Sequence, residues 1–148
     1  MGTHYKGNKE EELALDTWIK LARASNTVFN KIKPSMTEYG LSTSQFSVLE
    51  TLLHLGSMPQ NAISKKLLFT SGNIVKVVDN LEESGLVKRT ADKSDRRVHI
   101  IKLTKKGKRV IDKTFGYHVK NVVDTFSVLS DKEKQELARI CKKLGTNQ

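Results

Sequence analysis

The sequence predicts a mainly α-helical protein with one small β-hairpin, formed from a single domain of 148 residues. Apolar residues recur at helical spacing along most of the chain. Strand signals are few, and the clearest short apolar strand patterns lie between residues 86 and 103, on either side of a charged turn. The composition is 37% hydrophobic, which is enough for one packed core, and the net charge is +10. These observations favour an α-rich fold that carries a strongly basic hairpin.

A first helix is expected to begin between Asn8 and Glu12 and to run into the thirties. Its apolar residues cover more of the circumference than one stripe requires; they are Leu13, Leu15, Trp18, Leu21, Ala22, Val28, Phe29, Ile32 and Met36. A helix that is apolar around much of its surface favours burial, here against a second subunit. Pro34 predicts that the helix kinks or ends near Lys33.

The second helix has a clear N-terminal signal. Ser42 and Gln45 have the spacing of a capping box, and Leu41 with Phe46 has the spacing of a hydrophobic staple. The helix is therefore expected to begin after Ser42. Its core-facing residues are Phe46, Leu49, Leu52 and Leu53.

A third and a fourth helix follow. Residues 56–59 interrupt the second helix with a short strand segment, and residues 60–68 form the third. Either Thr70 or Ser71 can cap the fourth helix, and Gly85 suits the left-handed position that ends it. The buried stripe of the fourth helix recurs at i, i+3, i+4 and i+7 and comprises Ile74, Val77, Val78 and Leu81.

The hairpin is expected to pair residues 86–89 with residues 98–103 around a charged tip at 92–97. Between Leu86 and Arg109 there are ten Lys/Arg and two Asp residues, so this segment holds most of the net charge. A basic run alone is about as often a solvated surface without a partner as it is a binding site. A capped helix beside a cationic hairpin is more specific, because it suits the major and minor grooves of double-stranded DNA.

Two further helices are expected at the C-terminus. Thr104 can cap a long helix, and Ser130 with Glu133 forms a second capping box that opens the last one. Their apolar residues are Val110, Ile111, Phe115, Val119, Val122, Val123, Phe126, Leu137, Ile140, Cys141 and Leu144. Helices this apolar predict a dimer interface, and the alternative is a core within one chain.

In this order of elements the sequence resembles the MarR family of winged helix-turn-helix regulators over nearly its whole length. The matching motifs are Gly40-Leu41-Ser42 with Gln45-Phe46-x-Val48-Leu49, the run from Val78 to Arg89, Asp95-Arg96-Arg97, and Leu103-Thr104-x-x-Gly107. The resemblance implies a winged helix-turn-helix lobe at 41–103 and a helical dimerisation region at 1–40 and 104–148. It also implies a homodimer that binds a pseudo-palindromic operator, usually as a repressor. A small ligand, which can be aromatic, or an oxidant then releases the repressor from the operator.

The predicted DNA contacts lie on the fourth helix and the hairpin. By resemblance, Arg97 probes the minor groove, Asp95 orients it, and Arg96 meets phosphate or supports the tip. The residues Asn73-Ile74-Val75-Lys76 replace the commoner Thr-Val-Thr-Arg of the family, so the base-reading set does not transfer. Asn73 can read adenine, and Lys76 guanine or phosphate. The full predicted set is Thr70, Ser71, Gly72, Asn73, Lys76, Lys88, Lys93, Asp95, Arg96 and Arg97.

The resemblance also implies an effector pocket between the dimerisation region and the DNA-binding lobe. Candidate lining residues are Trp18, Phe29, Tyr39, His54, Phe115 and His118, and the alternative for each is a core position. Cys141 lies among Leu137, Ile140 and Leu144, so we expect a buried small hydrophobe rather than a redox sensor.

Several functional classes find no support in the sequence. There is no catalytic or phosphate-binding motif, so we expect neither an enzyme nor a bound cofactor. The four histidines are scattered and predict no metal site. A single cysteine, and the lack of a signal peptide or of an apolar run of eighteen, favour a cytoplasmic protein with no membrane partner. The alternative of another class is an architectural or RNA-binding protein without sequence preference.

Overall fold

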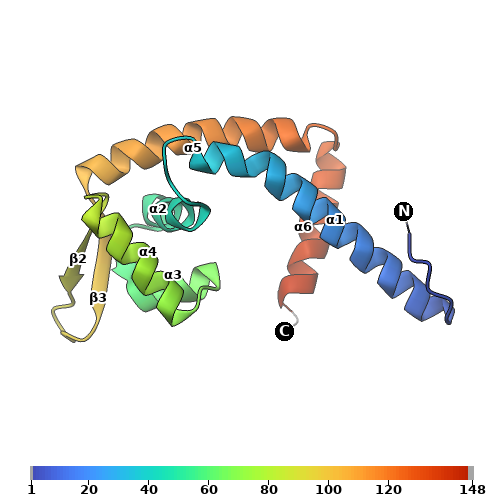
Figure 1. Ribbon diagram of the computed structural model, residues 1–148, viewed down its shortest axis with the longest axis horizontal. Coiled ribbons are helices and arrows are strands. Elements are labelled where there is room, and N and C mark those ends of the chain that lie inside the picture. The colour runs from blue at the N-terminus through green and yellow to red at the C-terminus, as the bar shows by residue number, and fades with distance from the viewer. Residues whose placement is uncertain (1, 147–148) are drawn as a thin grey trace. The chain divides into compact units, whose positions relative to one another are not determined.

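The structure is a computed structural model that describes residues 2–146 (Figure 1). Within these residues there are six α-helices and one three-stranded antiparallel sheet. The helices are α1 (Lys9–Thr37), α2 (Thr43–Leu55), α3 (Gln60–Leu67), α4 (Ser71–Glu83), α5 (Lys105–Phe126) and α6 (Asp131–Thr146), and the strands are β1 (Met58–Pro59), β2 (Val87–Ala91) and β3 (His99–Leu103). The mainly α class with a small hairpin is confirmed.

The chain divides into two compact units. One contains the described residues up to Ile32 and from Lys120 onward, and the other runs from Lys33 to Val119. Helices α1 and α5 therefore contribute to both units. The division predicted at residues 41 and 103 concerns dimerisation and stays a prediction.

The unit from Lys33 to Val119 contains the sheet and the main core. The strand order is β1-β3-β2, with Met58 opposite Ile101 and Val87 opposite Leu103. One cluster of buried side chains joins α2, α3, α4, α5 and the sheet; it consists of Leu41, Phe46, Val48, Leu49, Leu52, Ile63, Ile74, Val77, Val78, Leu81, Leu86, Val87, Ile101 and Ile111. Full burial of one such side chain stabilises the fold by about 1.5–3 kcal/mol. The predicted stripe of α4 is confirmed.

The predicted helix caps are present. The Ser42 amide donates to Gln45 Oε1 at 2.8 Å, and the Gln45 amide donates to Ser42 Oγ at 3.1 Å. Thr70, rather than Ser71, caps α4, because its Oγ1 accepts from the Asn73 amide at 3.2 Å. The capping box that opens α6 is also formed, by Ser130 and Glu133. A cap of this kind stabilises a helix by about 1 kcal/mol.

Helix α1 does not end near Lys33 but continues through Pro34 to Thr37. Proline removes one helical hydrogen bond, which tertiary contacts can offset. Ser35 is fully buried, and its hydroxyl lies 3.1 Å from His118 Nδ1. Thr37 Oγ1 donates to the Lys33 carbonyl at 3.2 Å, which supports the last turn.

The first turn of α5 approaches the end of α4 very closely. A Cβ added at Gly107 would lie 1.8 Å from the Leu86 carbonyl oxygen, so no side chain fits there. Thr104 Oγ1 donates to the Gly85 carbonyl at 2.7 Å and accepts from the Gly107 amide at 2.9 Å. Gly85 has φ +70°, as expected for the left-handed residue after α4.

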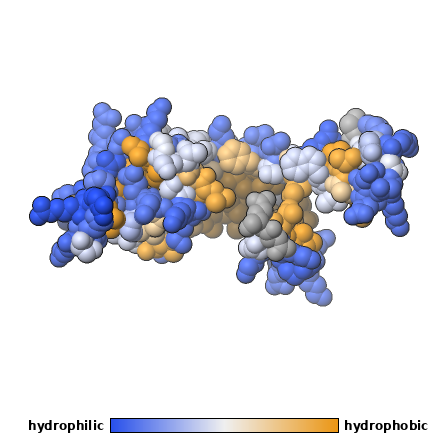
Figure 2. Space-filling view, turned by 90° about the horizontal axis from the view of Figure 1, so that it is seen from below, coloured by the Kyte–Doolittle hydropathy of each residue, from blue (hydrophilic) through white to orange (hydrophobic). Residues whose placement is uncertain are grey.

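The unit formed by the chain ends exposes much of its apolar surface. None of the described residues of α6 is buried, and Trp18 of α1 is 63% exposed. Figure 2 shows apolar patches on one face of the molecule between hydrophilic side chains. Cys141 is exposed in the single chain, so the prediction that this residue is buried within the chain is wrong. The neighbours on which the prediction relied, Leu137 and Ile140, are exposed with it.

Two glycines of α5 test the close approach at Gly107. We expect Gly107→Ala to lower the free energy of unfolding by about 3 kcal/mol, because the new methyl group meets the Leu86 backbone. Gly116→Ala is the matched control; its Cβ meets open space, and it should raise the free energy of unfolding by about 0.5–1 kcal/mol. Chemical denaturation measures both, and equal effects of the two substitutions contradict the account.

Candidate nucleic-acid interface

Helix α4 turns the outer side of its N-terminal half to solvent. Asn73 and Lys76 are exposed, while the buried stripe faces the core. The amides of Ser71 and Gly72 lie in the first turn, where a helix has no internal acceptors for its N–H groups. Gly72 has open space around its Cα, so a partner can come close to the backbone. This end of α4 can therefore offer two amides, an amide side chain and a cation to one ligand.

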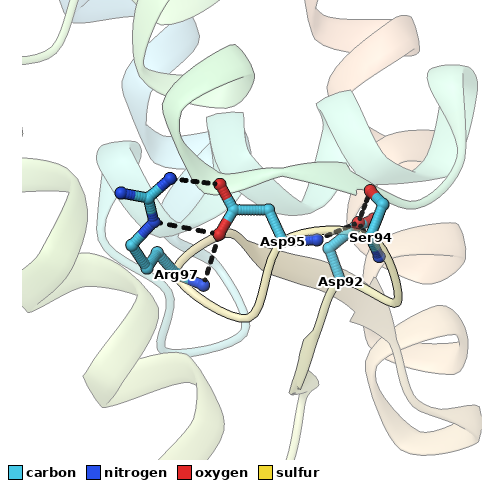
Figure 3. Close-up of polar contacts among 4 residues, drawn as sticks. All are labelled: Asp92, Ser94, Asp95 and Arg97. Atoms are coloured by element: carbon cyan, nitrogen blue, oxygen red, sulfur yellow. Dashed lines mark hydrogen bonds and ion pairs between the residues drawn. The ribbon is translucent and has the colours of Figure 1, made fainter.

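The hairpin tip is organised around two aspartates (Figure 3). Asp95 accepts from Arg97 Nε at 3.1 Å and from Arg97 Nη2 at 3.0 Å, and the same carboxylate accepts from the Arg97 amide at 3.0 Å. Asp92 accepts from the Ser94 hydroxyl, and from the amides of Ser94 at 2.8 Å and of Asp95 at 3.2 Å. The predicted contact between Asp95 and Arg97 is thus formed.

These contacts change the acidity of the tip residues. The Arg97 guanidinium and amide lower the pKa of Asp95, and the Ser94 hydroxyl and amide lower that of Asp92. The hydrogen bond with Asp95 raises the pKa of Arg97. The Arg97 side chain is nevertheless 91% exposed, so the fork with Asp95 restricts its direction without covering it. A cation held in one direction at the end of a hairpin suits insertion into a narrow groove.

A second arginine of the basic segment, Arg89, binds carboxylates of α4 rather than facing solvent freely. Arg89 Nη2 donates to Asp79 Oδ1 at 2.6 Å, and its Nη1 lies 3.8 Å from Glu82 Oε2. The Arg89 amide also donates to Glu82 Oε1 at 2.9 Å. Asp79 and Glu82 belong to α4 and Arg89 to β2, so these contacts fix the hairpin against α4.

Helix α3 contributes residues that the sequence reasoning missed. A hollow of about 230 Å³ between α3 and α4 is lined by Gln60, Asn61, Ser64, Lys65, Ser71, Ile74 and Val75. A neighbouring hollow of about 180 Å³ brings Gln60 and Asn61 together with Arg97 of the tip. Asn61, Ser64 and Lys65 recur at i, i+3 and i+4, so they share one polar face of α3. This polar face is the sequence pattern from which their place beside α4 and the hairpin could have been predicted.

The six candidate effector residues are divided between the two units. His54, Phe115 and His118 pack together, with ring centroids 4.7 Å apart for the first pair and 6.2 Å for the second. Burial lowers the pKa of His118, and Glu50 partly opposes this shift. Trp18 and Phe29 are exposed and belong to the other unit. The predicted pocket stays a prediction.

The sixth candidate, Tyr39, lines a basic hollow of about 380 Å³ at the start of α5. The other lining residues are Lys106, Arg109, Val110 and Lys113, without a carboxylate. Lys113 Nζ lies 4.7 Å from the centroid of the Tyr39 ring, within the range of a cation–π contact. Lys106 Nζ also donates to the Ser84 carbonyl at 2.8 Å. The hollow can hold an anion over an aromatic ring, next to the end of α4.

Other kinds of site are not found in residues 2–146. No group of three or more His, Cys, Asp or Glu side chains there could bind a metal ion. None of the helices described has the length and apolar character needed to cross a bilayer. Beside the carboxylates that hold Arg89 and Arg97, the exposed groups at α3, α4 and the hairpin include cations, amides and hydroxyls, and such groups bind phosphates and base edges.

Comparisons with a family model, with curated sequences and with solved structures all find transcriptional regulators. A family model described as the MarR family matches residues 41–99. The HTH-type transcriptional regulator MhqR of Bacillus subtilis (strain 168) is 35% identical over 136 residues, which cover 92% of this chain and 94% of MhqR. The crystal structure of CouR from Rhodococcus jostii RHA1 bound to p-coumaroyl-CoA has a TM-score of 0.79 at 26% identity, covering 92% and 96% of the two chains. AbsC, a MarR family regulator from Streptomyces coelicolor, shares the fold with a TM-score of 0.83 at 19% identity, covering 95% and 96%.

The fork at the hairpin tip predicts a pH dependence. Because the folded-state pKa of Asp95 is lowered, the pair stabilises the tip above the ordinary titration range of aspartate and is lost as the pH falls through the lowered pKa. We expect the Asp95 carboxyl carbon to titrate by NMR below the usual aspartate value, and Arg97→Ala to raise its midpoint. Asp92 is the internal control, since Ser94 holds it. An Asp95 midpoint that does not move in the variant contradicts the pairing.

Proposed function

The chain belongs to the MarR family, and on that premise we propose that it is a sequence-specific DNA-binding transcriptional regulator. It acts as a homodimer that represses transcription from a pseudo-palindromic operator, and a small ligand or an oxidant releases it. The observation that carries the proposal is the exposed N-terminal half of α4 beside a hairpin whose tip directs Arg97 outward.

The two elements suit different grooves of one half-site. An α-helix fits the major groove, where Asn73 is suited to adenine and Lys76 to guanine or phosphate. Arg97 is suited to the minor groove, whose negative potential attracts arginine. Lys65 of α3, and Lys88 of β2, are suited to backbone phosphates, which position the protein without reading sequence.

Dimerisation is supported by the exposed apolar side chains of the unit formed by the chain ends. These include Leu13, Trp18, Val123, Leu137, Ile140 and Leu144. A monomer rarely leaves so many large apolar side chains in water without a partner surface. Two-fold symmetry would place two copies of α4 in successive major grooves, about one helical turn apart.

The basic hollow at Tyr39 supports the proposal that a small ligand releases the protein from its operator. The relative CouR binds p-coumaroyl-CoA, a phosphate-bearing thioester with a phenolic ring. The hollow offers the matching groups, because three cations and an aromatic ring line it, with Lys113 over the ring. Lys106 lines it and also holds the Ser84 carbonyl at the end of α4, so an anion that recruits Lys106 would weaken the anchoring of the recognition helix. Such a ligand would favour dimers that do not fit the operator.

The hairpin arginine provides the test of DNA binding. We expect Arg97→Ala to weaken binding to the preferred duplex about tenfold to a hundredfold, the usual effect of losing a good groove contact. The duplex is the one that the wild-type protein selects from random sequences, and fluorescence anisotropy measures the affinity.

Arg139→Ala is the matched control for this prediction. Arg139 forms a similar exposed pair, with Glu136 at 2.7 Å, but lies on α6. Its loss should leave the affinity unchanged. Equal affinities of the Arg97 variant and the wild type would remove the hairpin tip from the mechanism.

The basic hollow gives a prediction for release. With p-coumaroyl-CoA as the probe, we expect the protein to leave its operator, and Arg109→Ala to raise the half-releasing concentration about tenfold, since one charge-assisted contact is lost. Lys108→Ala is the control, because Lys108 pairs with Asp112 at 2.9 Å and does not line the hollow. Identical release curves for wild type and Arg109→Ala contradict the assignment of the hollow.

A further inference from the structure

One apolar side chain stands on the otherwise polar outer side of α4. Val75 is 44% exposed, whereas the four residues of the buried stripe are 7% exposed or less. Its neighbours on the outer side of the first turns are Ser71, Gly72, Asn73 and Lys76. Val75 belongs neither to the core of the unit nor to the polar groups already assigned to DNA.

Folding gives no reason for an exposed valine at this position. A β-branched side chain loses rotamer freedom in a helix, so valine is a poorer helix former than alanine or lysine. The core cluster is complete without Val75, since Ile74 and Val78 on either side of it supply the buried contacts. The residue is therefore better explained by what α4 binds than by what α4 packs against.

The environment of Val75 is suited to a small apolar group. With Ile74, it provides the apolar side chains of the hollow between α3 and α4, whose other lining residues are polar. The major groove presents one apolar group, the C5-methyl of thymine, and apolar side chains contact it. Polar functions of other bases gain nothing from valine, and burying them against it is unfavourable.

We propose that Val75 contacts the C5-methyl group of a thymine in each half-site and makes the protein select thymine there. This inference rests on the proposed function, because it requires α4 to enter the major groove. It adds a residue to the reading surface that neither hydrogen bonding nor charge would identify. Asn73 and Lys76 would contact the polar edges of bases, and Val75 would contact the methyl group of a neighbouring thymine.

Replacing thymine by deoxyuridine tests the proposal, because it removes only the methyl group. Each thymine of the selected operator is replaced in turn, and affinities are measured by fluorescence anisotropy. We expect one position per half-site where the substitution weakens wild-type binding about fourfold, the effect of one lost buried methyl group. Val75→Ala changes both half-sites of the proposed dimer, so it should bind the thymine duplex about sixteenfold more weakly than wild type. It should not distinguish the thymine duplex from the uracil duplex.

Val119→Ala is the matched control, since Val119 is 43% exposed in the same unit but lies on α5. It should keep the wild-type preference for thymine. Equal wild-type binding of all thymine and uracil duplexes, or a preference that persists in Val75→Ala, overturns the proposal for Val75. If an operator is selected and Arg97 is needed for its binding, the proposed function stands even when Val75 fails. If no sequence is selected, both fail.

Discussion

The geometry of the proposed DNA-binding surface depends on the close approach of α5 to the turn that follows α4. Gly107 lies against the Leu86 carbonyl, Thr104 bonds the Gly85 carbonyl at 2.7 Å, and Lys106 bonds the Ser84 carbonyl at 2.8 Å. The end of α4, the first strand of the hairpin and the start of α5 are therefore fixed to one another. The ion pair of Arg89 with Asp79 adds a second tie between the hairpin and α4. A helix and a hairpin tip held in this way can fit two grooves at once without much loss of entropy on binding.

The positive charge of the segment is less available than its sequence indicates. Arg89 and Lys108 are engaged with carboxylates, and Asp95 partly offsets Arg97. Lys106 and Arg109 line the basic hollow at the base of the hairpin, about 17 Å from the tip for a strand of five residues. The charge is thus divided among attachment of the hairpin, a candidate anion site, and the proposed contact with DNA. Specificity must come from the few groups that α4 and the tip hold in place, since phosphate contacts carry no sequence information.

Local signals in the sequence predicted most of the fold. The capping boxes at Ser42 and Ser130, the stripe of α4 and the left-handed Gly85 involve neighbours in the chain, so spacing alone identifies them. The passage of α1 through Pro34 could not be predicted, because a buried contact of Ser35 with His118, 83 residues away, supports it. The same limit applies to the site: the Asp95–Arg97 fork is local and was expected, whereas the hollow at Tyr39 joins segments about 70 residues apart. Exposure also has to be seen in the structure, as Val75 and Cys141 show.

The most direct test of the account is selection of random duplex DNA by the purified protein near physiological salt. A dimer that places two α4 helices and two hairpin tips on one duplex predicts enrichment of a palindrome with half-sites about one helical turn apart. A specific complex of this kind should also keep a preference for that sequence as salt rises. The contradicting result is the absence of any enriched motif, together with binding to all duplexes that declines equally with salt; the protein would then be an architectural one that uses its basic surface without reading sequence.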